Sequence, residues 1–243
     1  MGHRTKGPRR KATALQADGD PRGFGTSGGP EDSLLLVETY HSVQGESTRA
    51  GEPCWFVRTA RCNLRCRWCD SEFTFRGGVR RPLDEVVAEA LQSGAPLVEV
   101  TGGEPLLQQA VLPLMARLAD AGRTVLLETG GSLDVSAVDP RVVRIVDLKC
   151  PGSGEADRNR WENLSLLTAR DEVKFVLADR ADYEWAREVI RERLAGLPPV
   201  VLLSPVHGEL PPKDLVAWML EDRLPARLNL QIHKVIWGDA RGV

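Results

Sequence analysis

Three cysteines fall close together in this chain, and their spacing limits what the chain can fold around. Cys62, Cys66 and Cys69 follow a C-x3-C-x2-C pattern directly after an apolar run, residues 55–60, that is typical of a β-strand. An odd number of thiols so close in sequence cannot all pair as disulfides, but they can converge on a metal. Three cysteines on one loop suit an iron–sulfur cubane whose fourth iron keeps an open position.

Two other interpretations of the cysteines stay open from spacing alone. A structural zinc site would take a fourth ligand from Cys54, Cys150 or one of His41, His207 and His233. The sequence lacks the paired C-x2-C units, or the C-x2-C with H-x3-H, that zinc knuckles use. Free buried thiols are the other alternative, and we expect Cys54 and Cys150 to be of that kind. The pattern favours the cluster.

Composition places the chain among ordinary globular proteins. Its 243 residues are 42% hydrophobic and 27% charged, which suits a single domain with one core. A formal net charge of −2 gives no reason to expect a nucleic-acid or membrane partner. No apolar run reaches the roughly 18 residues that cross a membrane, and residues 1–31 lack the apolar core that a secretory signal requires. We therefore expect a cytoplasmic protein, because thiols stay reduced in the cytosol.

Two regions are predicted along the chain. Residues 1–31 are rich in Gly, Pro, Arg and Ala, and we expect a disordered N-terminal extension there. Such a segment cannot bury enough apolar surface to offset the entropy of ordering. A start codon assigned too early would explain the same residues, and a functional basic arm is the remaining alternative. Residues 32–243 are predicted to form one domain.

Strand-like and helix-like segments alternate along this domain. Strands are predicted at residues 34–39, 55–60, 96–101, 124–129, 142–149, 172–177 and 200–205, with a final strand-like segment at 228–237. Helices are predicted at residues 82–92, 108–121, 161–168, 182–194 and 213–221, with a weak turn near 135–138. This alternation implies right-handed crossovers and a parallel sheet. The six βα units that begin at the cysteine-bearing strand are too few for a closed eight-stranded barrel, so we expect an open, curled sheet.

Polar and glycine-rich motifs follow three of these strands. They are Thr101-Gly102-Gly103-Glu104, Glu128-Thr129-Gly130-Gly131 and Asp147-Leu148-Lys149. The carboxyl ends of parallel strands meet at one edge of a sheet, where ligands bind. A glycine pair lets the backbone approach a ligand closely, although a plain turn would also use it. Asp147 and Lys149 could face a ligand at this edge, or they could simply neutralise each other's charge.

The cysteine loop resembles the signature of the radical S-adenosylmethionine (SAM) superfamily, C-x3-C-x-aromatic-C, with Trp68 at the aromatic position. The resemblance implies an α/β fold of the radical SAM type, a partial (βα)6 TIM-like barrel. It also implies one [4Fe-4S] cluster on the three cysteines, with SAM chelated by the open iron. The residues that it assigns to SAM are Trp68, Gly103, Asp147, Leu148 and Lys149.

Further motifs are Ser42-Val43-Gln44-Gly45-Glu46 before the first core strand, Arg58 within it, Asp70-Ser71-Glu72 after the last cysteine, and residues 231–243. Together these motifs are similar to those of the 7-carboxy-7-deazaguanine synthase family of queuosine and deazapurine biosynthesis. The resemblance runs from residue 34 to residue 243. It implies a lyase that converts 6-carboxy-5,6,7,8-tetrahydropterin to 7-carboxy-7-deazaguanine with loss of ammonia. A radical formed from SAM takes hydrogen from the pterin and later returns it.

This second resemblance implies roles for individual residues. Glu46 and Arg58 are expected to be catalytic, with Gln44 and Glu46 reading the pterin edge. Arg58 is expected to bind the substrate carboxylate through its planar fork. Ser71 is expected to hold Mg²⁺, although by itself it suits the start of a turn. The expected substrate pocket comprises Val43, Gln44, Gly45, Arg58, Thr101, His233 and the α-carboxylate of Val243, which the apolar residues 235–237 would pack in place.

The resemblance also implies partners. An electron donor such as flavodoxin or ferredoxin and a homodimeric assembly are expected. A radical SAM glycyl-radical activase is the alternative enzyme, since it shares the cysteine pattern but often carries additional cysteines for further clusters. A zinc-stabilised binding module is the alternative that is not an enzyme. Metal analysis after anaerobic purification distinguishes them, with about four irons per chain for a cubane and about one zinc for the module.

Overall fold

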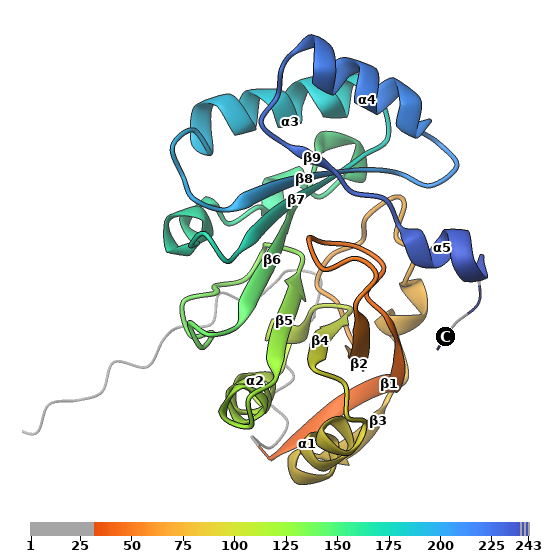
Figure 1. Cartoon of the computed structure of the whole chain (residues 1–243), viewed down its shortest axis with the longest axis vertical. Helices are drawn as coiled ribbons and strands as arrows, with labels where there is room; N and C mark the ends of the chain where they lie inside the picture. Colours follow the sequence, from red (N-terminus) through yellow and green to blue (C-terminus); the bar gives the residue numbers. More distant parts are fainter. Residues whose placement is uncertain (1–31, 239, 241, 243) are drawn as a thin grey trace, which may run out of the picture.

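The computed structural model describes residues 32–238, 240 and 242, so the predicted extension at residues 1–31 lies outside the described residues. Its strands are β1 (Ser33–Val43), β2 (Pro53–Thr59), β3 (Val79–Pro82), β4 (Leu97–Gly102), β5 (Thr124–Thr129), β6 (Val143–Leu148), β7 (Glu172–Leu177), β8 (Val200–Pro205) and β9 (Arg227–Leu228). They form a single curled sheet in the order β3-β1-β2-β4-β5-β6-β7-β8-β9 (Figure 1).

The strands from β2 to β8 give the sheet its parallel character. Each neighbouring pair, from β2 with β4 to β7 with β8, is parallel, which confirms the predicted six-stranded (βα) arrangement. At one edge β1 pairs antiparallel with both β2 and β3, and at the other edge β9 adds a short parallel strand. The sequence pattern marks β1 as a strand but does not show which strand it pairs with.

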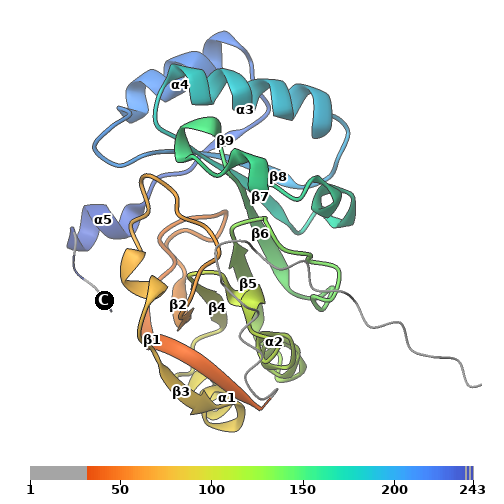
Figure 2. The ribbon, with the colours of Figure 1, turned by 180° about the vertical axis from the view of Figure 1, so that it is seen from behind.

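Four helices lie on the outer face of the sheet: α1 (Leu83–Gln92), α2 (Val111–Asp120), α3 (Arg180–Arg193) and α4 (Pro212–Glu221). A fifth, α5 (Ile232–Trp237), lies beside the cavity instead. Short 3-10 helices join them: η1 (Glu72–Phe75), η2 (Pro105–Leu107), η3 (Pro151–Ser153), η4 (Ala156–Arg158) and η5 (Trp161–Leu166), the last replacing the helix predicted at residues 161–168. Helices α1 and α2 cover one half of the sheet, and α3 and α4 cover the other (Figures 1 and 2). None of the helices in the described part of the chain is long and apolar enough to span a membrane.

Side chains alternate between the two faces of each strand, which separates the outer cores from the barrel interior. On β4, Val98 and Val100 pack outward against α1 and α2, whereas Leu97 packs inward. The inward side of the barrel is apolar at its lower level, where Phe56 and Leu126 join Leu97. Above this apolar layer the inward positions become polar, and these polar positions line the cavity described below.

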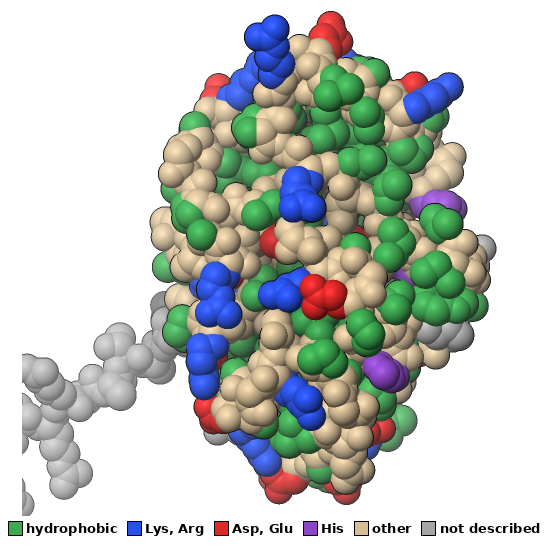
Figure 3. All heavy atoms as spheres, in the orientation of Figure 1, with side chains coloured by type: hydrophobic (Ala, Val, Ile, Leu, Met, Phe, Trp, Pro, Cys, Tyr) green, Lys and Arg blue, Asp and Glu red, His purple; other side chains and the backbone are tan. Residues whose placement is uncertain are grey.

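The C-terminal segment differs from its prediction. Residues 228–237 were expected to be strand-like, but β9 ends at Leu228 and residues 232–237 form α5. The chain leaves the sheet edge because the Ile232 amide donates to the Gly45 carbonyl oxygen, 2.9 Å away, across the open side of the barrel. Residues 235–237 were also expected to pack, yet Val235 and Ile236 are 81% and 55% exposed. Hydrophobic side chains gather on the surface where α5 lies (Figure 3).

A buried ion pair joins β6 to the start of β7 and gives a stability prediction. Arg144 Nη2 lies 2.7 Å from Asp171 Oδ2, with both side chains at least nine-tenths buried. Replacing Asp171 with Ala would leave a buried guanidinium without its partner. We expect Asp171→Ala to lower the free energy of unfolding by about 3–5 kcal/mol, measured by urea denaturation. Although burial raises it, hydrogen bonds from Arg144 and Thr168 hold the pKa of Asp171 below its usual value.

The matched control is Asp84→Ala, because the ion pair of Asp84 with Arg117 is exposed to solvent. That substitution should cost less than about 1 kcal/mol. Because the folded-state pKa of Asp171 is lowered, the stabilisation from its charge is present above the unfolded-state pKa. The stabilisation is lost as the pH falls through the folded-state pKa. Equal losses for Asp84→Ala and Asp171→Ala would contradict the role given to the buried pair.

Candidate active site

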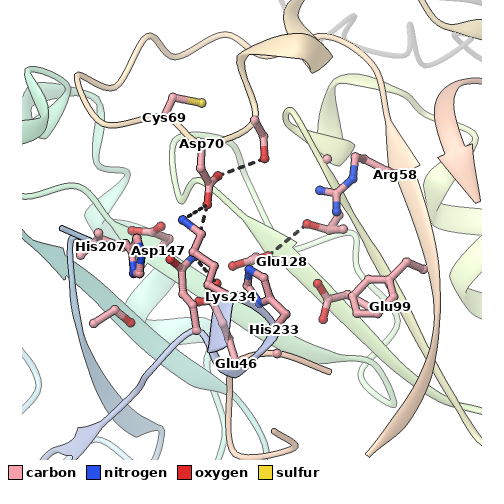
Figure 4. A pocket seen from close by; sticks show the side chains of 18 of the residues that line it. Glu46, Arg58, Cys69, Asp70, Glu99, Glu128, Asp147, His207, His233 and Lys234 are labelled. Atoms are coloured by element: carbon pink, nitrogen blue, oxygen red, sulfur yellow. Dashed lines mark hydrogen bonds and ion pairs between the residues drawn. The ribbon is translucent and has the colours of Figure 1, made fainter. Parts of the chain in front are cut away.

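A cavity of about 740 Å³ opens at the carboxyl ends of the parallel strands. The cysteine loop, the loop after β1 and helix α5 line this cavity (Figure 4). The predicted site residues that line it are Val43, Gln44, Gly45, Glu46, Arg58, Cys62, Cys66, Trp68, Cys69, Ser71, Thr101, Gly103, Asp147, Lys149 and His233. Leu148 is an exception, since its side chain is fully buried in the core on the outer face. Val243 lies outside the described residues.

The three clustered cysteines are brought together at one end of this cavity. Cys62, Cys66 and Cys69 are partly buried free thiols, whereas Cys54 and Cys150 are fully buried away from them. Neighbouring contacts hold the loop in shape, with Leu64 buried beneath it and the Arg65 amide donating to Glu155 over 2.7 Å. The predicted separation of three clustered thiols from two structural ones is therefore present in the fold.

The chemistry of the three thiols fits a cluster better than a single metal ion. In the described part of the chain, no three Cys, His, Asp or Glu side chains converge closely enough to hold one ion, which gives no support to zinc. A cubane takes each thiolate on a different iron, so it accepts thiols that surround a larger volume. Burial raises the pKa of the Cys62 thiol to about 11 and also raises the pKa values of Cys66 and Cys69. Metal binding would release these protons.

The glycine motif after β4 brings the backbone close to the cysteine loop. A Cβ atom at Gly103 would lie 2.0 Å from the Arg61 carbonyl oxygen, so only glycine fits there. Glu104 does not face the cavity. Its buried carboxylate accepts hydrogen bonds from the Thr129 hydroxyl and from the Gly130 amide, 2.8 Å away. The glycines and Glu104 together fix the ends of β4 and β5 beside the thiols.

Asp147 and Lys149 form an ion pair on the wall of the cavity. Lys149 Nζ lies 2.9 Å from Asp147 Oδ2, as expected for residues two apart on one face of a strand. Charge neutralisation, the alternative considered above, is therefore present. It leaves Asp147 Oδ1 buried, and no described residue donates to it. A buried carboxylate oxygen without a donor costs free energy, so this atom indicates a ligand with a hydroxyl or amino group.

Ser71 lies beside the third cysteine and is available to a ligand. It precedes η1, but its hydroxyl makes no capping hydrogen bond to that helix. The hydroxyl instead donates to Asp70 Oδ1 over 3.0 Å, and the turn is held by the Ser71 carbonyl oxygen. The turn-forming alternative thus uses the backbone of Ser71 and leaves its hydroxyl oxygen facing the cavity.

The loop after β1 closes the barrel from below. Its side chains Gln44 and Glu46 were predicted to bind the substrate, but both already have partners within the protein. Gln44 is buried, and its amide is already paired at both ends. Its Nε2 donates to Glu99, and its Oε1 accepts from the Glu46 amide over 3.0 Å. The carboxylate of Glu46 accepts from Gln231 over 2.9 Å and contacts Lys174 over 3.1 Å. These two side chains are therefore held firmly by the protein instead of being free to rotate toward a ligand.

Lys174 is the cation at the centre of the cavity floor, and the sequence analysis did not select it. Its ammonium group contacts Glu46, Glu128 and Asp147, which come from a loop and from two different strands. Although burial alone would lower it, these carboxylates hold the pKa of Lys174 well above its usual value. Thr101 donates to Glu128 over 3.0 Å and so joins the same network.

Arg58 lies in the cavity wall, but its planar fork is divided between two neighbours. Nε donates to Glu38 over 2.8 Å, and Nη2 donates to the Tyr40 hydroxyl over 2.6 Å. The antiparallel register explains this, because Glu38 is directly opposite Arg58 on β1. Two of the five guanidinium N–H groups are used in this way, so a bidentate contact with a substrate carboxylate, as expected from the sequence, is limited to the edge formed by Nη1 and Nη2. Nη1 has no partner among the described residues and remains available.

The C-terminal segment closes the open side of the barrel. Gly45 lies so close to His233 that a Cβ atom there would be 2.0 Å from the His233 Nδ1 atom. Lys234 Nζ lies 3.4 Å from Asp70, the residue between Cys69 and Ser71 (Figure 4). This segment therefore contacts both the lower loop and the cysteine loop, and it brings the predicted residue His233 into the site.

Glu99 and Lys174 were missing from the predicted set of site residues, although one signal was present, whereas Glu128 was expected at the cavity and lines it. Glu99 and Lys174 each interrupt a buried apolar strand, in Leu97-Val98-Glu99-Val100 and in Val173-Lys174-Phe175. A charged side chain at an inward position of a parallel strand must face the barrel interior, because both faces of such strands are covered. That reasoning would have placed both residues in the cavity.

Comparisons with known proteins agree with this geometry. The model of the radical SAM superfamily matches residues 56–220. A 7-carboxy-7-deazaguanine synthase from Koribacter versatilis is 50% identical over 220 residues, which cover 84% of this chain and 97% of that protein. A protein of the same name from Chlorobaculum tepidum is 46% identical over 217 residues, covering 88% and 99% of the two chains. The chain belongs to the 7-carboxy-7-deazaguanine synthase family of the radical SAM superfamily.

A solved structure supports the fold of this family member. The crystal structure of QueE from Escherichia coli superposes with a TM-score of 0.67 at 23% identity, and the match covers 82% of this chain and 94% of that one. The similarity confirms the predicted fold, a partial TIM-like barrel of the radical SAM type. The resemblance inferred from the cysteine loop and the flanking motifs is confirmed as well.

The arrangement of the five cysteines gives a direct test of the site. Cys66→Ser should lose most of the iron and the brown colour of the anaerobically purified protein, because two thiolates cannot retain a cubane. Cys54→Ser should keep both, since Cys54 is buried in the lower layer of the barrel away from the cavity. Iron and sulfide assays with visible absorption spectra provide the measurement. Full iron content in Cys66→Ser would refute the cluster assignment.

Proposed function

We propose that the chain is a radical SAM lyase that converts 6-carboxy-5,6,7,8-tetrahydropterin to 7-carboxy-7-deazaguanine with loss of ammonia. The observation that carries the proposal is one cavity with two chemically different ends, in a member of this family. Three thiols and the Asp147–Lys149 pair mark one end, and a dense set of hydrogen-bonding side chains marks the other. The glycyl-radical activase and the zinc module have no such support in the structure.

Cys62, Cys66 and Cys69 would hold the [4Fe-4S] cluster. When bound there, the cluster and SAM supply the radical that activates the substrate. Trp68, Gly103 and Asp147 line the same end and would contact SAM. Asp147 Oδ1 has no donor among the described residues, so it suits a ribose hydroxyl or an amino group. Leu148, with its side chain in the outer core, would contribute only through its backbone.

The lower end of the cavity would hold the pterin. The backbone of Val43, Gln44 and Gly45 and the side chains of Thr101 and His233 line it. The Nη1 group of Arg58 would donate to the substrate carboxylate, while Glu38 and Tyr40 keep the guanidinium in place. Glu46, fixed by Lys174 and Gln231, would accept hydrogen bonds through its remaining lone pairs. Val243, outside the described residues, stays a proposed contact through its α-carboxylate.

Further parts of the proposal concern partners. An electron donor such as flavodoxin or ferredoxin would reduce the cluster, and the protein would act in the cytosol. A homodimer is proposed. The exposed apolar side chains of Val235 and Ile236 on α5 support this proposal, because they could be covered by a second subunit. Sedimentation equilibrium at several protein concentrations tests the dimer. A monomer at all concentrations would contradict it.

The activity has a direct assay. Anaerobic protein with SAM, a chemical reductant and 6-carboxy-5,6,7,8-tetrahydropterin should yield 7-carboxy-7-deazaguanine, detected by mass spectrometry. Cys66→Ser serves as the inactive control because it lacks a cluster ligand. Cleavage of SAM with no change in the mass of the pterin would refute the proposed substrate and leave the family assignment intact.

Ser71 gives the test of the proposed Mg²⁺ site. Ser71→Ala should weaken the dependence of turnover on Mg²⁺, because it removes a hydroxyl ligand and leaves the turn held by the backbone. Iron content and SAM cleavage should stay unchanged, and Ser71→Thr, which keeps a hydroxyl, should behave like the parent protein. Turnover is measured against Mg²⁺ concentration. Identical Mg²⁺ curves for Ser71→Ala and the parent would return Ser71 to a purely structural role.

A further inference from the structure

Glu99 occupies an unusual position for an acidic residue. It lies on the inward side of β4, and its register neighbours are Phe56 on β2 and Leu126 on β5. Both neighbours belong to the apolar layer of the barrel interior. Glu99 is only 3% exposed, yet it lines the cavity. A carboxyl group is therefore placed where the fold otherwise puts hydrocarbon.

Cations near Glu99 are already engaged by other carboxylates. Lys174 contacts Glu46, Glu128 and Asp147, and the guanidinium of Arg58 is bound by Glu38. None of the described residues forms an ion pair with Glu99. The titratable and charged groups that face it are Tyr40 from β1, Glu46 from the loop after β1, Cys54 and Arg58 from β2, Glu128 from β5, Lys174 from β7 and His233 from α5.

The two oxygens of Glu99 have different surroundings. Oε2 accepts a hydrogen bond from the Nε2 of Gln44. No described residue donates a hydrogen bond to Oε1, and Glu99 lines the cavity. Figure 4 shows the carboxyl group pointing into the space beside Glu128 and His233. One oxygen is thus fixed by the protein, and the other is presented to a ligand.

The neutral form of Glu99 is the one that this position favours. An ionised carboxylate in an apolar layer without a cation loses most of its solvation, and a proton removes that cost. Burial, reinforced by the negative charges of Glu128 and Glu46, raises the pKa of Glu99 well above its usual value. A neutral carboxyl has one hydroxyl donor and one carbonyl acceptor. Gln44 uses the acceptor, so the hydroxyl is left for the cavity.

We propose that Glu99 is a specificity-determining residue that stays protonated at neutral pH and donates a hydrogen bond from Oε1 to an acceptor atom of the heterocyclic substrate. That acceptor is a carbonyl oxygen or an unprotonated ring nitrogen. The identity of the substrate rests on the proposed function, whereas the protonation of Glu99 does not. Glutamine imitates the proposed state, because its amide nitrogen donates into the cavity and its amide oxygen accepts from Gln44.

The first experiment tests protonation without turnover. Infrared spectra of the anaerobic, cluster-loaded protein at pH 7 should contain the C=O band of a neutral carboxyl group that Glu99→Gln lacks. Glu85→Gln is the control, since Glu85 is exposed on α1 and its substitution should leave that band unchanged. A spectrum of Glu99→Gln that matches the parent in the neutral-carboxyl region would overturn the proposal.

The second experiment measures KM for the carboxytetrahydropterin against pH. In the parent, KM should rise as the pH passes through the raised pKa of Glu99, because ionisation removes the donor. Glu99→Gln should keep a KM within about threefold of the parent at neutral pH, and its KM should not rise at high pH, because the amide keeps a donor. Loss of the donor is expected to raise KM by about five- to a hundred-fold. Glu99→Leu should raise KM by that factor already at neutral pH, with kcat less affected.

Formation of 5′-deoxyadenosine without pterin confirms that each variant is folded and binds SAM. A parent-like KM in Glu99→Leu, or a KM in Glu99→Gln raised as far as in Glu99→Leu, would overturn the donor role. A protein that shows the infrared band and cleaves SAM but does not convert the pterin would refute the proposed function. In that case the infrared result still decides the protonation of Glu99.

Discussion

The ammonium group of Lys174 is the interaction on which the cavity depends. It contacts carboxylates from the loop after β1, from β5 and from β6, through Glu46, Glu128 and Asp147. In the barrel interior these carboxylates would repel one another strongly without a shared cation, because charges there are weakly screened. Lys174 therefore allows the lower loop and the polar strand ends to occupy one small volume. Among the described residues it also leaves Glu99 without an ion-pair partner, so the same interaction favours the neutral form of that residue.

Much of the fold and half of the site could be predicted from local sequence. Strands β5, β7 and β8 have the predicted bounds, because a buried parallel strand is a continuous apolar run between turn residues. The three cysteines were located by spacing alone, since one short loop necessarily brings them together. Gly103 and Asp147 could be found as well, because residues that end parallel strands meet at the same edge of the sheet.

The partners of Arg58 and the C-terminal helix could not be predicted in this way. They depend on contacts between distant segments, which the spacing of residues along the sequence does not show. The division of the Arg58 fork between Glu38 and Tyr40 follows from the antiparallel register of β1 with β2. The helix at the C-terminus follows from a hydrogen bond to Gly45, nearly two hundred residues earlier. The apolar, β-branched run Val235-Ile236 is typical of a strand, but it pairs with none of the described strands and lies in α5 instead.

The C-terminal segment connects the two ends of the cavity where it crosses the open side of the barrel. Gln231 donates to Glu46 at the floor and also to Asp70 beside the third cysteine, over 2.9 and 3.2 Å. Lys234 adds an ion pair to the same Asp70. A shift of the cysteine loop would therefore break contacts of the C-terminal segment, and a shift of that segment would break the contact of Gln231 with Glu46. None of the described strands closes the partial barrel on this side, so these few polar contacts hold the cysteine loop and the floor at a constant separation.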